Sequence, residues 1–121
     1  EGQYISNNPS KNLLRDDKII DIEEDSFIND AIMIKNFKSK TISLKQKEDN
    51  KKILELDMSD FPILAIWTIP KAQYICLEPW FNYADRVIET GYFKDKEGIL
   101  NLKPNEEFNC KFSVKFFWYF I

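Results

Sequence analysis

The chain has 121 residues, 44% of them hydrophobic and 15% aromatic, which suits a soluble domain with its own core. Its net charge of −3 and isoelectric point near 5.0 argue against a nucleic-acid partner, because such proteins usually carry a basic patch. The sequence contains no histidine, which excludes every His-dependent catalytic triad and argues against a zinc site.

Residues 1 to about 18 are polar and rich in turn-forming residues, so they predict a loop. The first half of the chain then shows short apolar runs, two of which alternate with period two. A charged hairpin loop is expected at Lys47–Lys52. We predict strands at Ile19–Ile22, Ala31–Ile34, Thr41–Lys45 and Leu54–Met58.

The second half contains one nearly continuous apolar run, which predicts a buried strand between Pro62 and Pro70. Residues 81–98 carry mixed signals and predict a long connection with room for a helical turn. The final strand would place Cys110, Phe112, Val114 and Phe116 on one face. We predict strands at Ile63–Ile69, Tyr74–Glu78, Ile99–Leu102 and Cys110–Phe116, so the fold class is all-β.

Cellular location is indicated by the cysteines and by the lack of long apolar runs. Cys76 and Cys110 form neither a disulfide framework nor a CxxC pair, which favours free thiols and a cytoplasmic protein. The apolar run Phe116–Ile121 is far too short to span a bilayer, so no membrane partner is expected. Since the chain begins at Glu1 and shows no secretory signal pattern, we expect a processed chain or part of a longer one.

Glu78 is the most informative residue of the sequence. It lies in Cys76-Leu77-Glu78-Pro79-Trp80, where alternation directs the glutamate to one face and Pro79 is expected to end the strand just beyond it. The carboxylate is then expected at the rim of a sheet, beside aromatic surface. A carboxylate in such a place can serve as a proton acceptor.

Several separated motifs resemble the C-terminal part of the aldose 1-epimerase (galactose mutarotase) family. The resemblance covers about Asp17 to Phe116 and is most similar to a bacterial branch with Leu-Glu-Pro-Trp at the catalytic glutamate. Its motifs occur in the order Phe27–Ile32, Asn36–Lys40, Phe61–Pro70, Ile75–Trp80, Ala84-Asp85, Lys96–Ile99 and Leu102–Phe108.

The resemblance implies a large antiparallel β-sandwich of the galactose mutarotase-like type. A chain of this length would supply less than half of that fold. Residues 1–121 are therefore expected to be a single β domain or the C-terminal fragment of a larger mutarotase-like domain.

The resemblance also implies a reaction, the exchange of α and β anomers of an aldose such as galactose or glucose. A base removes the proton of the anomeric hydroxyl and an acid protonates the ring oxygen, so no metal or organic cofactor is required. By position Glu78 matches the family's glutamate base. A strand-end carboxylate held by backbone amides or a lysine is the alternative interpretation.

Three further residues are candidates for sugar binding. Asp30 could match the family aspartate that binds sugar hydroxyls, and a plain turn aspartate is the competing interpretation. Trp67 and Trp80 could each offer an apolar face to a pyranose ring, although core or rim packing is the more ordinary role. Asp85 and Arg86 could shape the pocket or pair with each other at the surface.

The family's acid is a histidine from the N-terminal half, and this chain contains none. We therefore expect residues 1–121 alone to lack appreciable epimerase activity. Two alternatives stay open, a non-catalytic carbohydrate-binding module and a structural β fragment. The apolar tail Phe116–Ile121 further predicts a covering partner, either the N-terminal half of the same protein or a second copy of the chain.

Overall fold

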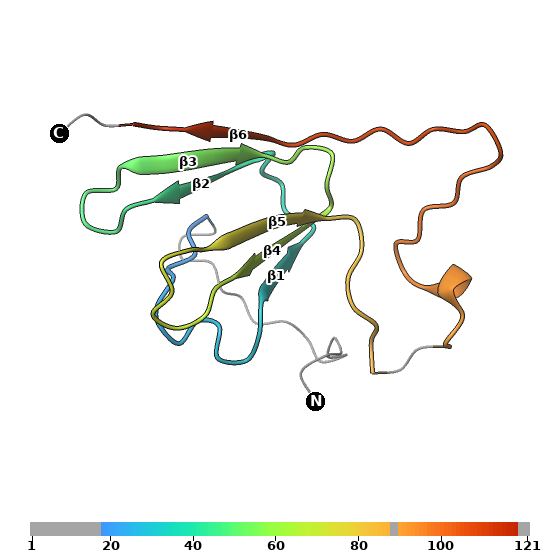
Figure 1. The fold of residues 1–121 in the computed structure, drawn as a ribbon, viewed down its shortest axis with the longest axis horizontal. Helices are drawn as coiled ribbons and strands as arrows, with labels where there is room; N and C mark the ends of the chain where they lie inside the picture. The colour runs from blue at the N-terminus through green and yellow to red at the C-terminus, as the bar shows by residue number, and fades with distance from the viewer. Residues whose placement is uncertain (1–17, 88–89, 119–121) are drawn as a thin grey trace.

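The computed structural model describes residues 18–87 and 90–118, so most of the predicted N-terminal loop and the end of the apolar tail lie outside the described residues. The described residues form six strands in two antiparallel sheets, together with one short 3-10 helix (Figure 1). The all-β prediction is confirmed. The elements are β1 (Ile32–Lys35), β2 (Thr41–Lys45), β3 (Lys52–Asp57), β4 (Ile63–Trp67), β5 (Cys76–Trp80), η1 (Phe93–Asp95) and β6 (Ser113–Phe116).

Each sheet has three strands, in the orders β1-β4-β5 and β2-β3-β6. In the first sheet β4 is central, and β5 is an edge strand whose Glu78 lies opposite Ala65. In the second sheet β3 is central, and β6 is an edge strand whose Phe116 lies opposite Leu54. The last strand of the chain therefore joins a different sheet from the strand that carries Glu78.

The hairpin between β2 and β3 confirms the alternation read from the sequence. β2 has the predicted bounds, and its Ile42 and Leu44 lie opposite Leu56 and Leu54 on one face. The connection is closed by the Gln46 amide, which donates to the Lys51 carbonyl at 2.8 Å. The alternating apolar residues thus predicted which residues of the two strands share a face. The predicted bounds of the second strand are wrong, because β3 spans Lys52–Asp57 rather than Leu54–Met58 and so includes a residue that was assigned to the loop.

Predicted strand ends are wrong in all three strands of the first sheet. β1 spans Ile32–Lys35, one residue later than the predicted Ala31–Ile34. β4 stops at Trp67 rather than Ile69, because the chain turns there and the Thr68 hydroxyl donates to the Tyr74 carbonyl at 2.6 Å. β5 begins at Cys76 and continues through Pro79, which was expected to end it. Proline has no amide proton to donate, but in an edge strand its nitrogen can face away from the neighbouring strand without loss of a hydrogen bond.

Three other predicted strands differ in the structure. Ile19–Ile22 forms only an isolated β-bridge residue at Ile19, and Ile99–Leu102 is irregular. Within the described residues no strand pairs with either segment, so local apolar character alone did not make a strand. β6 is shorter than Cys110–Phe116, although Val114 and Phe116 do share a face as predicted. The helical turn expected within residues 81–98 is η1.

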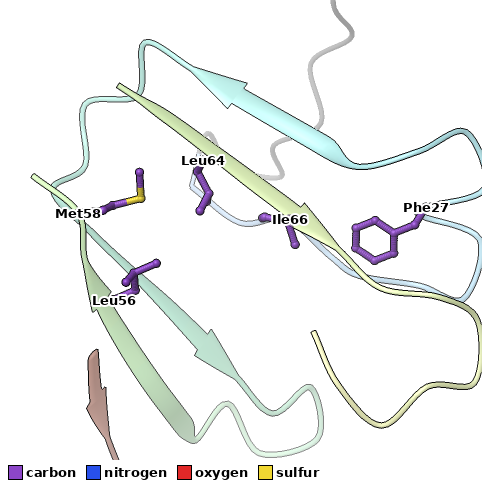
Figure 2. Close-up of a cluster of buried hydrophobic side chains, with 5 residues drawn as sticks. All are labelled: Phe27, Leu56, Met58, Leu64 and Ile66. Atoms are coloured by element: carbon purple, nitrogen blue, oxygen red, sulfur yellow. The ribbon is translucent and has the colours of Figure 1, made fainter. Parts of the chain in front are cut away.

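The main hydrophobic cluster draws side chains from both sheets (Figure 2). Leu64 and Ile66 come from β4, Leu56 comes from β3, Met58 follows β3, and Phe27 precedes β1. Leu56, Met58 and Leu64 are almost completely buried. One face of each sheet therefore contributes to a shared core, and the opposite faces are available for other roles.

Replacing Leu56 by alanine should lower the free energy of unfolding by about 2–5 kcal/mol, because the substitution leaves a cavity in this cluster. Urea unfolding followed by circular dichroism would measure the loss. Ile53→Ala on the same strand is the matched control, since Ile53 is already 40% exposed and should cost much less. Equal losses for the two variants would contradict the position of the core.

Candidate functional site

Glu78 lies in the middle of β5 and its side chain is half-buried. Its direct cross-strand neighbour is Ala65, which is fully buried although its side chain is a single methyl group. Larger side chains on the same face must therefore cover Ala65. The glutamate is part of a packed sheet face rather than a flexible surface position.

Side chains opposite each other in antiparallel strands point to the same face, so the register defines which residues surround Glu78. On β5 the residues of this face are Cys76, Glu78 and Trp80, and Trp67 of β4 lies opposite Cys76. The register therefore places three of the four predicted site residues on one face. Trp67, at the end of this face, also packs against the shared hydrophobic core and the Tyr74 ring, which is the more ordinary role considered for it. The complete face, called here the Glu78 face, consists of Met33, Lys35, Ile63, Ala65, Trp67, Cys76, Glu78 and Trp80.

No hydrogen bond or ion pair holds the Glu78 carboxylate within residues 18–87 and 90–118. The alternative interpretation of this glutamate required backbone amides or a lysine as its partner. Glu55 on β3, which is also half-buried, differs because it forms an ion pair with Lys52 at 2.5 Å. Among the described residues, the Glu78 carboxylate has no partner of either kind.

Asp30 does not share the Glu78 face. It lies in the turn before β1 with φ 114°, and its side chain accepts a hydrogen bond from the Ala31 amide at 2.7 Å. Because β1 starts opposite the end of β4, Asp30 is located at the end of the sheet where Trp67 lies. Its described contact is local and typical of a turn aspartate.

The loop after β5 is tied to the sheet by a buried tyrosine that sequence reasoning missed. The ammonium of Lys35 on β1 lies 3.5 Å from the centre of the Tyr83 ring, and Tyr83 is 7% exposed. Arg86 donates to the Tyr83 hydroxyl at 3.1 Å and also pairs with Glu97. The alternation of β1 could have placed Lys35 on this face, but nothing local indicated its contact with Tyr83.

Asp85 and Arg86 do not pair with each other. Asp85 pairs with Lys96 at 2.7 Å, and Arg86 pairs with Glu97, so both ion pairs connect the start of the loop to its end. Gly98 follows with φ 80°, a backbone conformation that glycine adopts without strain. The loop is thereby closed on itself next to Trp80.

An open hollow of about 420 Å³ lies beside the end of β5. Its volume falls in the range of small-molecule sites, although it is shallow rather than enclosed. Glu78 does not line the hollow, although the next residue, Pro79, does, and Trp80 forms part of its wall. The lining residues are Phe61, Pro79, Trp80, Phe81, Asn82, Tyr83 and Ala84.

The part of the chain that the structure describes contains no cluster of three or more His, Cys, Asp or Glu side chains suited to a metal ion. A search of the same residues finds no helix with the length and apolar character needed to cross a membrane.

Comparison with known proteins identifies two relatives, the plasmid and chromosomal forms of protein LacX from Lactococcus lactis subsp. lactis. Each is 32% identical over 92 residues, which cover 75% of this chain. The chain spans only 30% of the length of these curated relatives. No family model matches the chain, and no solved structure matches it.

The loop network makes a prediction about pH. A hydrogen bond from the Tyr83 hydroxyl, together with the charges of Lys35 and Arg86, lowers the pKa of the Glu97 carboxyl below its ordinary value of 4.5. The resulting stabilisation is present above that value and is lost as the pH falls through the lowered pKa. In Tyr83→Phe, the pKa of Glu97 should rise toward 4.5, as measured by carboxyl NMR titration.

Asp49 provides the internal control for this titration, because its pKa is lowered by Lys51 in the distant hairpin. That pKa should stay unchanged in Tyr83→Phe. An unchanged pKa of Glu97 would contradict the role assigned to the tyrosine hydroxyl.

Proposed function

We propose that the chain is the C-terminal part of an aldose 1-epimerase-like protein and that Glu78 is its general base. The observation that carries this proposal is the carboxylate of Glu78, which has no described partner and lies on a packed sheet face between Trp67 and Trp80. The ordered set of motifs from Phe27 to Phe108 resembles that family and supports the same role.

The proposed reaction needs two proton transfers. Glu78 would remove the proton of the anomeric hydroxyl, and an acid would protonate the ring oxygen, so that the ring opens. Rotation about the bond between C1 and C2 followed by closure gives the other anomer, and the two groups return to their starting protonation. A carboxylate with no partner among the described residues is suited to the first transfer.

The acid is proposed to come from polypeptide outside this chain, because the chain contains no histidine. The LacX relatives are more than three times as long as the matched segment, so proteins of this kind do contain further polypeptide. We further propose, from the resemblance of the motifs, that these two sheets are part of a larger β-sandwich of the galactose mutarotase-like type. These residues alone are then expected to be inactive.

The substrate is proposed to be an aldose such as galactose or glucose. Trp67 and Trp80 lie on the same face as Glu78, so an indole could pack against the apolar side of a pyranose ring while the carboxylate reaches its hydroxyls. Trp80 also lines the adjoining hollow, which would accommodate the rest of the sugar. Asp30 is a weaker candidate, since it lies in the turn before β1.

Glu78→Gln should lower the rate of anomer exchange by about 10²–10⁴-fold, because the amide cannot accept the proton. The rate would be measured by polarimetry or exchange NMR in the longest natural polypeptide that contains these residues. Glu55→Gln is the control, as its carboxylate lies in the other sheet and pairs with Lys52. Full activity of Glu78→Gln would show that another group is the base.

A non-catalytic carbohydrate-binding module is the second candidate, favoured by the open hollow that Trp80 lines in a chain without histidine. It predicts that galactose or glucose changes the tryptophan fluorescence of the chain saturably, with no effect on anomer exchange. Trp80→Phe should weaken this binding, whereas Trp118→Phe should not. Absence of a saturable change would exclude this candidate.

A further inference from the structure

β6 presents an apolar side that nothing described covers. Its Val114 and Phe116 lie opposite Leu56 and Leu54, whose side chains belong to the core-facing side of the second sheet. Leu56 is only 2% exposed, yet Val114 is 40% exposed and Phe116 is 59% exposed. The core face of this sheet therefore extends one strand beyond the part that is packed.

The uncovered surface continues on both sides of β6. Phe112 before the strand is 58% exposed and Trp118 after it is 84% exposed, with the Trp118 ring 6.5 Å from that of Phe116. We call these side chains, Phe112, Val114, Phe116 and Trp118, the β6 strip. Four large apolar side chains in a row form a patch of the kind that marks an interface.

The backbone of β6 is also unpaired on its outer side. The Phe117 amide donates to the Ile53 carbonyl at 2.9 Å, so the hydrogen-bonded pairs of this ladder include residues 117, 115 and 113. By alternation the amides and carbonyls of Val114 and Phe116 point away from β3. Figure 1 shows β6 at the outer edge of its sheet, with no described strand beyond it.

The edge of β5 differs in this respect. Pro79 has no amide proton to offer an added strand, so proline protects that edge as it does in many sheets. β6 has no such protection, because its outward residues Val114 and Phe116 are both normal donors and acceptors. An added strand would be accepted at β6 and disfavoured at β5.

We propose that the sheet β2-β3-β6 continues past β6 with a strand from polypeptide outside this chain, and that the β6 strip is the interface it covers. The occupant is a strand with alternating apolar residues on the core side. We propose that this strand comes from the rest of the same protein. The chain spans only 30% of the length of the LacX relatives, so a protein of that length would have further polypeptide to pair here. The inference does not need Glu78 to be a base.

Amide hydrogen exchange tests the strand directly in the longest natural polypeptide that contains these residues. The Lys115 amide faces β3 in any case and is the internal reference. The Val114 and Phe116 amides should exchange within about 10-fold of the Lys115 rate if a further strand binds them. Exchange faster than that of Lys115 by about 100-fold or more would show a free edge and would overturn the proposal.

Two substitutions test the covered side chains in the same polypeptide. Phe116→Gln should lower the melting temperature by roughly 6 °C or more, because it places an amide in a buried apolar site. Lys115→Gln is the matched control on the opposite face of the same strand and should change it by less than about 2 °C. Equal shifts for the two variants would overturn the proposal.

The source of the strand is tested by dilution. Protection of Val114 and Phe116 that persists in a protein shown to be monomeric by light scattering supports a strand from the same polypeptide. Protection that disappears as a dimer dissociates would identify a second copy as the occupant and would overturn the proposal. Amide hydrogen exchange of Val114 and Phe116 should be the same in Glu78→Gln. Such a result would show that the proposed strand at β6 does not depend on the proposed catalytic role of Glu78.

Discussion

The structure depends on β4, a strand whose residues Ile63–Ile66 are buried on both faces. Leu64 and Ile66 pack into the shared core, while Ile63 and Ala65 lie beneath the Glu78 face. A one-residue slip of β5 along β4 would turn Glu78 toward the core and Leu77 away from it. Burial of a carboxylate without a partner is costly, so the apolar residues of β4 set the position of the candidate base.

The edge strand of the second sheet, β6, is not held by burial as β4 is. β3 resembles β4 in carrying core residues, but β6 beyond it is exposed along its whole length. Its apolar side chains are arranged as a core face would be, with Val114 and Phe116 in register with Leu56 and Leu54. The described residues therefore form one sheet whose central strand is buried on both faces and one sheet whose core face is only partly covered.

Sequence reasoning predicted what depends on local alternation and missed what depends on neighbours. The bounds of β2 followed from Thr41–Lys45 alone, but the common face of Glu78 and Trp80 did not follow, because Pro79 was expected to end the strand between them. Ile99–Leu102 has the same local character as a strand but has no described partner, and Pro79 is tolerated only because β5 is an edge. Lys35 and Tyr83 meet across 48 residues of sequence, which no local pattern can indicate.

The two proposals require different things of the proposed polypeptide outside this chain. An acid for the proposed reaction is needed at the Glu78 face, on the side of the first sheet that points away from the shared core. A strand is needed at β6, in the other sheet and beside its core-facing side chains. Because a single strand could not satisfy both, the two proposals together call for further polypeptide that makes at least two separate contacts, which suits relatives more than three times the length of the matched segment.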